Sequence, residues 1–120
     1  MKAKIKEIYS LEIPSSIEDY WPSDELNFGL SIRLIVGPDE ADGGESFDLL
    51  VCTPDWIKNQ YADEGGVWGH HMLIVFEYDW KFIKEKIELF AAGCSGRDWP
   101  ELARKLSLVA AWEFEDYQLA

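Results

Sequence analysis

The stretch FGLSIRLIVGPDEADGGESFDLLVCT, residues 28–53, decides the fold of this chain. Its first part alternates apolar with small or polar side chains, the apolar ones being Phe28, Leu30, Ile32, Leu34 and Val36. The alternation returns at Phe47, Leu49 and Val51, after nine residues rich in turn formers that include four acids. A period of two is typical of a strand with one buried face, so the stretch predicts a β-hairpin with a long acidic tip.

The N-terminal flank predicts an edge strand followed by a loop. Residues 2–13 follow a period-two pattern that is broken at Glu7, with lysines on one side. The side chains expected on the other side are Ala3, Ile5 and Tyr9. Lysine is common on edge strands, where it discourages further pairing. Residues 14–27 mix Pro, Ser and acids without a sustained period and indicate an acidic loop.

The C-terminal flank begins with a helix and continues into a strand. Thr53 followed by Pro54 predicts a helix start, and we expect the helix to end near Ala62. An acidic glycine loop occupies residues 63–66, and residues 70–78, HHMLIVFEY, predict another strand. Because this strand is apolar on both faces, we expect it to lie at the centre of the sheet.

Two further helices complete the pattern. Asp79 caps a helix that stops near Gly93, and Asp98 starts another, with Glu101 as its capping-box partner. The order of elements predicts an α+β fold in a single domain, residues 1–120, with an antiparallel or mixed sheet of about four strands and two to three helices packed mainly on one face. The other face is expected to carry the apolar side chains Ile35, Leu50, Leu73 and Val75.

Composition narrows the class of protein. Among 120 residues, 23 are acidic and 11 basic, which gives a net charge of −12. Such a field repels nucleic acid and anionic membranes and attracts basic proteins. Apolar runs are far shorter than the ~20 residues of a membrane-spanning helix, and nothing resembling a secretory signal precedes Cys52 and Cys94. We therefore expect a cytoplasmic protein with two reduced thiols.

The sequence offers little for catalysis or cofactor binding. Adjacent side chains of a strand point to opposite faces, so His70 and His71 are not expected to hold one metal ion. The glycine pairs at 43–44 and 65–66 lack the context of a phosphate-binding motif. Basic patches with interleaved aromatic residues are also missing. We expect no enzyme activity, no cofactor or metal, and no direct contact with nucleic acid.

Acidic residues gather instead beside aromatic ones, in the N-terminal loop, at the hairpin tip, in the glycine loop and in the C-terminal tail. Aromatic anchors with an acidic rim suit a basic protein partner. The candidate contact residues are Trp21, Asp39, Glu40, Asp42, Glu45, Asp63, Glu64, Trp68, Trp112, Glu113, Glu115, Asp116 and Tyr117.

Four strings, in this order, resemble the immunity protein 8 family: SFDLLVCTPDWI (46–57), GHHMLIVFEYDW (69–80), CSGRDWPELARKL (94–106) and WEFEDY (112–117). The most specific are CTPDW and WEFEDY, because a generic α+β fold demands neither. Trp56, in the first string, is expected to be structural. The resemblance implies a protein that binds and neutralises a bacterial polymorphic toxin in the cell that makes it. A basic nuclease is one toxin that an acidic protein would suit.

The residues leave two other functions open. The first is an interaction module or small subunit that assembles through the apolar second face of the sheet, a homodimer included. The second is a small enzyme that pairs His70 or His71 with Cys52 or a carboxylate. Measurements of self-assembly, metal content and turnover distinguish both from a toxin-binding protein.

Overall fold

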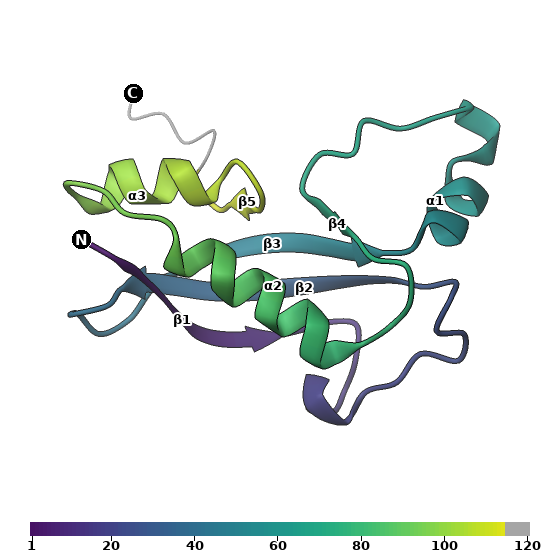
Figure 1. Ribbon diagram of the computed structural model, residues 1–120, viewed down its shortest axis with the longest axis horizontal. Coiled ribbons are helices and arrows are strands. Elements are labelled where there is room, and N and C mark those ends of the chain that lie inside the picture. Colours follow the sequence, from purple (N-terminus) through teal and green to yellow (C-terminus); the bar gives the residue numbers. More distant parts are fainter. Residues whose placement is uncertain (115–120) are drawn as a thin grey trace.

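The computed structural model describes residues 1–114, which form a five-stranded sheet with two of the three α-helices across one face (Figure 1). The strands are β1 (Ala3–Tyr9), β2 (Gly29–Pro38), β3 (Glu45–Cys52), β4 (Met72–Ile74) and β5 (Ala111–Trp112). The helices are α1 (Pro54–Gln60), α2 (Trp80–Ala92) and α3 (Trp99–Leu106), with short 3-10 helices η1 (Ile17–Asp19) and η2 (Ala62–Glu64). Strands β1 to β4 lie in that order, and β5 also pairs with β3. The pairs are antiparallel except β3–β4, which confirms an α+β fold with a mixed sheet.

Strands β2 and β3 form the long antiparallel hairpin that residues 28–53 predict. Their register pairs Gly29 with Cys52 at one end and Val36 with Glu45 at the other. The alternating apolar side chains of both strands therefore share one face, and α2 and α3 lie across it (Figure 1). The core includes Leu30, Ile32, Leu34, Phe47, Leu49 and Val51 from the hairpin and Ile83, Ile87, Leu102 and Leu106 from the helices.

Strand β1 lies at the edge of the sheet, as predicted, but a β-bulge changes which side chains it buries. The register with β2 jumps between Ile5 and Glu7, so Lys6 is the extra residue. Beyond a bulge, the alternation along a strand restarts one residue later. Ile8 therefore shares the core face with Ile5, and Tyr9 lies on the opposite face. The prediction that Tyr9 and Ile5 lie on one side is wrong.

Strand β4 is short and lies at an edge, so the prediction of a central strand is wrong. Within residues 1–114 it pairs only with β3, in parallel and over three residues. His71, just before it, has a φ of 57°, a left-handed conformation that starts the strand later than predicted. Leu73 and Val75 pack in the core, whereas Phe76 is exposed. An apolar run therefore does not by itself identify a strand that is buried on both faces.

The second face of the sheet is not the apolar surface that the pattern predicted, because two of its four expected residues belong to the core face. Its middle holds an ion pair, in which Arg33 Nε lies 2.8 Å from Asp48 Oδ1. At one end the ring of Trp56, from α1, lies directly against Gly29. A partner that covered this face would have to desolvate the ion pair, which is costly. The expected apolar surface was the main reason to propose self-assembly through this face, and the structure does not show that surface.

The helices start where the sequence predicts, and all of them are short. Asp79 and Asp98 cap α2 and α3 by accepting hydrogen bonds from the main-chain N–H groups of Phe82 (3.2 Å) and Glu101 (3.0 Å). Thr53 precedes α1 but does not cap it, since its hydroxyl accepts the N–H of Phe28 instead, at 3.1 Å. None of the helices within residues 1–114 is long and apolar enough to cross a membrane.

Candidate interaction surfaces

The candidate contact residues fall into separate groups because they lie at opposite ends of the sheet. The β2–β3 turn, residues 39–44, lies at one end, whereas residues 20–28 and 61–71 lie at the other (Figure 1). The longest dimension of the molecule is 41 Å. A typical interface covers about 800 Å² of each partner, which is about 32 Å across if it is round. One such interface does not span both ends, so the groups are distinct candidate surfaces.

The first surface, the acidic turn, is formed by residues 39–44, whose exposed acids are Asp39, Glu40 and Asp42. Two hydrogen bonds fix its backbone. The N–H of Asp39 donates to the carbonyl of Lys2 (2.9 Å), and the ammonium group of Lys6 donates to the carbonyl of Ala41 (2.7 Å). The turn contains no aromatic or large aliphatic residue. It therefore offers negative charge without an apolar anchor.

Glu45 belongs to the same predicted cluster, but the structure uses it inside the fold. Its Oε1 accepts hydrogen bonds from the indole N–H groups of Trp99 (2.5 Å) and Trp112 (2.9 Å). The ring of Phe47 stacks on that of Trp112, with centroids 6.2 Å apart and an interplanar angle of 11°. Trp112 and Glu45 are both only partly exposed. These contacts hold α3 and β5 on the sheet.

The C-terminal candidates are only partly described. The Oε1 atom of Glu113 accepts the N–H of Ser46 at 2.9 Å, and the N–H of Glu113 donates to the carbonyl of Ser46 at 3.1 Å. Glu113 therefore extends the pairing of β5 with β3. Glu115, Asp116 and Tyr117 lie outside the described residues, so their role as contact residues stays a prediction.

The second surface has a rigid aromatic base. The N–H of Tyr78 donates to the carbonyl of Glu25 at 2.7 Å, which joins residues 20–28 to the segment between β4 and α2. Tyr78 is 2% exposed. Three rings pack edge-on against it, those of Tyr20, Trp21 and Phe28, with centroids 5.9, 5.1 and 5.2 Å away. Two segments that are far apart in the sequence thus form one packed unit.

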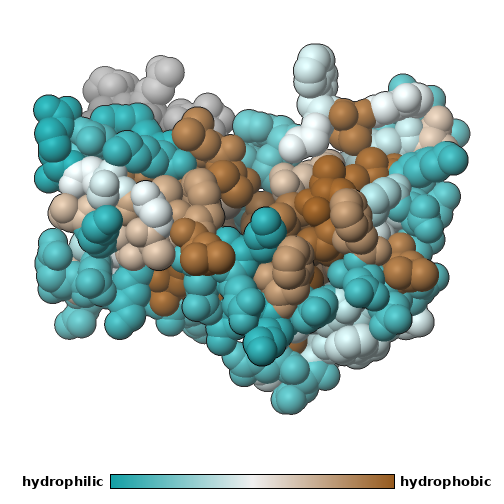
Figure 2. All heavy atoms as spheres, in the orientation of Figure 1, coloured by the Kyte–Doolittle hydropathy of each residue, from teal (hydrophilic) through white to brown (hydrophobic). Residues whose placement is uncertain are grey.

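Large apolar side chains stand exposed on this base. Trp21 is 61% exposed and Phe76 is 82% exposed. Figure 2 shows apolar residues gathered over β4 and the segment that leads from it to α2. We call this surface the aromatic end and define it by the exposed residues of the two segments: Trp21, Leu26, Ile74 and Phe76, with the acids Asp24, Glu25 and Glu77.

Trp21 is among the contact residues that the sequence predicts, whereas Phe76 is not. The strand predicted over residues 70–78 places Phe76 inside the sheet, whereas β4 ends at Ile74. Its environment is nevertheless readable, because the string Phe76-Glu77-Tyr78-Asp79 alternates aromatic residues with acids, as the other candidate clusters do. This composition is the feature of the sequence that could have identified Phe76 as a candidate contact residue.

The loop between α1 and β4 carries three more candidates, the exposed residues Asp63, Glu64 and Trp68. Trp68 is 93% exposed, and the loop that carries it lies at the same end of the sheet as the aromatic end (Figure 1). The rings of His70 and His71 follow, with centroids only 3.6 Å apart, so the prediction that they point to opposite faces is wrong. The cause is the left-handed backbone of His71, which lies before the strand. Nevertheless, no group of three metal-binding side chains occurs within residues 1–114.

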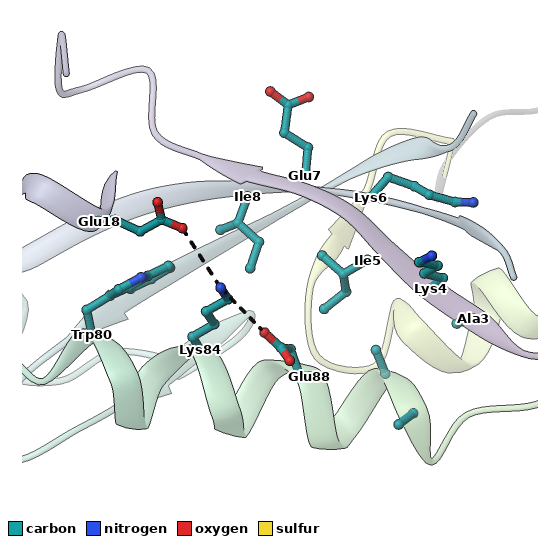
Figure 3. A pocket seen from close by; sticks show the side chains of 12 residues that line it. Ala3, Lys4, Ile5, Lys6, Glu7, Ile8, Glu18, Trp80, Lys84 and Glu88 are labelled. Atoms are coloured by element: carbon teal, nitrogen blue, oxygen red, sulfur yellow. Dashed lines mark ion pairs between the residues drawn. The ribbon is translucent and has the colours of Figure 1, made fainter. Parts of the chain in front are cut away.

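A hollow of about 580 Å³ lies between β1 and α2 (Figure 3). Ile5 and Ile8 of β1 point toward α2, where Lys84 lies 3.8 Å from Glu18 and 4.0 Å from Glu88. One ammonium group thus pairs with two carboxylates in the hollow. The hollow is lined by no thiol, imidazole or hydroxyl side chain of the described residues.

The two cysteines contribute to packing. Cys52 and Cys94 are free and buried. Burial raises the pKa of both thiols, which reduces the fraction of reactive thiolate at neutral pH. Cys52 lies opposite Ile74 in the β3–β4 ladder, and His71 Nε2 lies 3.0 Å from the carbonyl oxygen of Ser107. This geometry gives no support to a small enzyme built on Cys52.

Fold and surface together define a small acidic α+β protein with exposed aromatic side chains at one end. The chain belongs to the immunity protein 8 family, whose family model matches residues 3–117. This match confirms the resemblance carried by the four strings. Comparisons with curated proteins and with solved structures gave no match.

Proposed function

We propose that this member of the immunity protein 8 family binds a cognate bacterial polymorphic toxin and neutralises it in the cytoplasm of the cell that makes it. Family membership over residues 3–117 is the observation that carries the proposal. The exposed aromatic and acidic side chains support it, because buried aromatic contacts supply much of the free energy of protein association.

The charge of the chain suits a basic toxin, such as a nuclease. With a net charge of −12, the protein attracts a positively charged surface over distances of about the Debye length, 8 Å at physiological salt. A nuclease must itself be basic where it binds the phosphates of its substrate. An acidic protein can occupy that surface and keep nucleic acid out.

The mechanism is steric and electrostatic blockade, in which no covalent bond forms or breaks. Carboxylates at the contact pair with Lys and Arg of the toxin, and aromatic side chains exclude water from its centre. Rapid association matters because a toxin that is free in the cytoplasm acts until it is bound. Electrostatic steering raises association rates by one to three orders of magnitude.

Co-expression with the toxin encoded next to this chain tests the proposal. We expect growth to be rescued, and the purified proteins to form a complex whose affinity falls as salt rises, since the attraction between the charges is screened. The matched control is co-expression with a toxin encoded elsewhere, which should stay lethal. If the protein neither binds the toxin nor rescues growth, the proposed function is wrong. If binding does not depend on salt, the proposal that the toxin is basic is wrong.

A further inference from the structure

We infer that the toxin docks on the aromatic end, where Phe76 and Trp21 act as anchors that enter an apolar hollow within a basic surface. This inference rests on the proposed function and goes beyond it by naming the surface and the chemistry that the partner surface must have. Three observations carry it: how the anchors are supported, how charge is distributed around them, and what the base contains.

The anchors stand on a base that is already ordered. Trp21 packs against Tyr78, and Tyr78 is fixed by its main-chain bond to Glu25 and by the edge-on ring of Phe28. Phe76 precedes Tyr78 by two residues, in a bend between β4 and α2. Because Trp21 packs on this base, its side chain loses little conformational freedom on binding, which leaves more of the contact energy for affinity. Preorganised aromatic side chains are typical of binding hot spots.

Acidic side chains predominate around the anchors, although Lys84 of α2 pairs with Glu18, 3.8 Å away. Residues 17–28 contain four acids and no Lys or Arg, and Glu77 is exposed beside Phe76. A toxin surface that covers these carboxylates must pair them with Lys or Arg side chains. These basic side chains must surround an apolar centre that receives the two anchors. The acidic turn differs, because it has no large apolar side chain and lies beside Lys2 and Lys6. It can attract the toxin, but it has no anchor that would hold it.

The base contains a buried polar atom without a partner among the described residues. The hydroxyl oxygen of Tyr78 is inaccessible to solvent and has no hydrogen-bond partner within residues 1–114. Such groups are rare in folded proteins, because each loses its bonds to water without replacement. The ring of Trp21, which is mostly exposed, lies 5.1 Å from the ring of Tyr78. The hydroxyl thus lies in the base that supports Trp21, and it is one of two buried side-chain polar atoms without a partner among the described residues, the other being Nε1 of Trp80.

The decisive experiment compares two exposed apolar residues that differ in location. Phe76→Ala removes the proposed anchor, and Leu89→Ala removes a side chain that is 73% exposed on α2, outside the aromatic end. With the full chain and the purified toxin, we expect Phe76→Ala to raise the dissociation constant by about 30-fold or more. Leu89→Ala should raise it by less than about twofold. Most of the loss should appear as faster dissociation.

Trp21→Ala is a second variant, which removes the other proposed anchor. Phe76→Lys is a third variant, which places a positive charge where it would repel a basic partner. Because Phe76 is exposed, neither change at that position removes core packing, and thermal unfolding checks this directly. If the unchanged protein binds the toxin while all three variants bind within about twofold of it, the docking surface is wrong and the proposed function stands. If the unchanged protein neither binds nor rescues, the proposed function itself fails.

Discussion

Trp112 donates its indole N–H to the carboxylate of Glu45, 2.9 Å away, across 67 positions of sequence. The same oxygen accepts the indole N–H of Trp99 at 2.5 Å. One carboxylate therefore ties β5 and α3 to the start of β3. Hydrogen bonds to a charged acceptor are stronger than those between neutral groups, and removal of the acceptor leaves both donors without a partner.

Glu45→Ala should therefore lower the free energy of unfolding by about 1–3 kcal/mol, because two partly buried indole N–H groups lose their acceptor. We expect toxin affinity to change by less than about twofold. Urea denaturation and calorimetric titration measure the two effects. Glu40→Ala is the matched control, since Glu40 is exposed on the neighbouring turn and should change stability by less than about 0.5 kcal/mol. Lost affinity at unchanged stability would instead place Glu45 in the contact.

Gly29 allows α1 to pack on the sheet. A Cβ atom at this position would lie 2.2 Å from Cε2 of Trp56, so the indole would have to move. We expect Gly29→Ala to lower the free energy of unfolding by about 1–3 kcal/mol through overpacking. In the Trp56→Ala variant the indole is absent, so Gly29→Ala should lower the free energy of unfolding by much less. A double-mutant cycle measures this coupling, and strictly additive costs would contradict it.

Features that depend on neighbouring residues could be predicted from the sequence. The β2–β3 hairpin follows from the alternation between Phe28 and Val51, and the caps of α2 and α3 follow from Asp79 and Asp98. Each of these signals lies within a few residues of the structure that it specifies. The family resemblance similarly rests on local strings.

Features that depend on distant partners could not be predicted. The bulge at Lys6 is a property of the β1–β2 register, and the break of the period-two pattern at Glu7 marks its place without identifying it as a bulge. Glu45 belongs to an acidic string, yet its role is set by indoles 54 and 67 positions away. Phe76 is exposed because β4 ends early, which an apolar run does not reveal. The contact surface was therefore predicted only in outline.

Charge reversal on the acidic turn should change the rate of association and leave the rate of dissociation unaltered. The variant Asp39→Lys, Glu40→Lys, Asp42→Lys halves the net negative charge, and these residues surround no apolar anchor. Stopped-flow measurements at low salt should show association slowed by up to about tenfold, with a flatter salt dependence. Near 1 M salt the variant and the unchanged protein should associate equally fast. Faster dissociation would place the turn inside the contact.

Stability should fall in mildly alkaline solution, because burial raises the pKa of the Cys52 and Cys94 thiols. In the unfolded chain these thiols ionise near pH 8.5, so between that pH and their higher folded pKa values the folded chain binds more protons than the unfolded one. The free energy of unfolding therefore declines as pH rises through this window. Urea denaturation at pH 7 and pH 9.5 measures the decline. In the double variant Cys52→Ala, Cys94→Ala, stability should be lower at both pH values but less dependent on pH; an equal pH dependence would show that the thiols do not cause it.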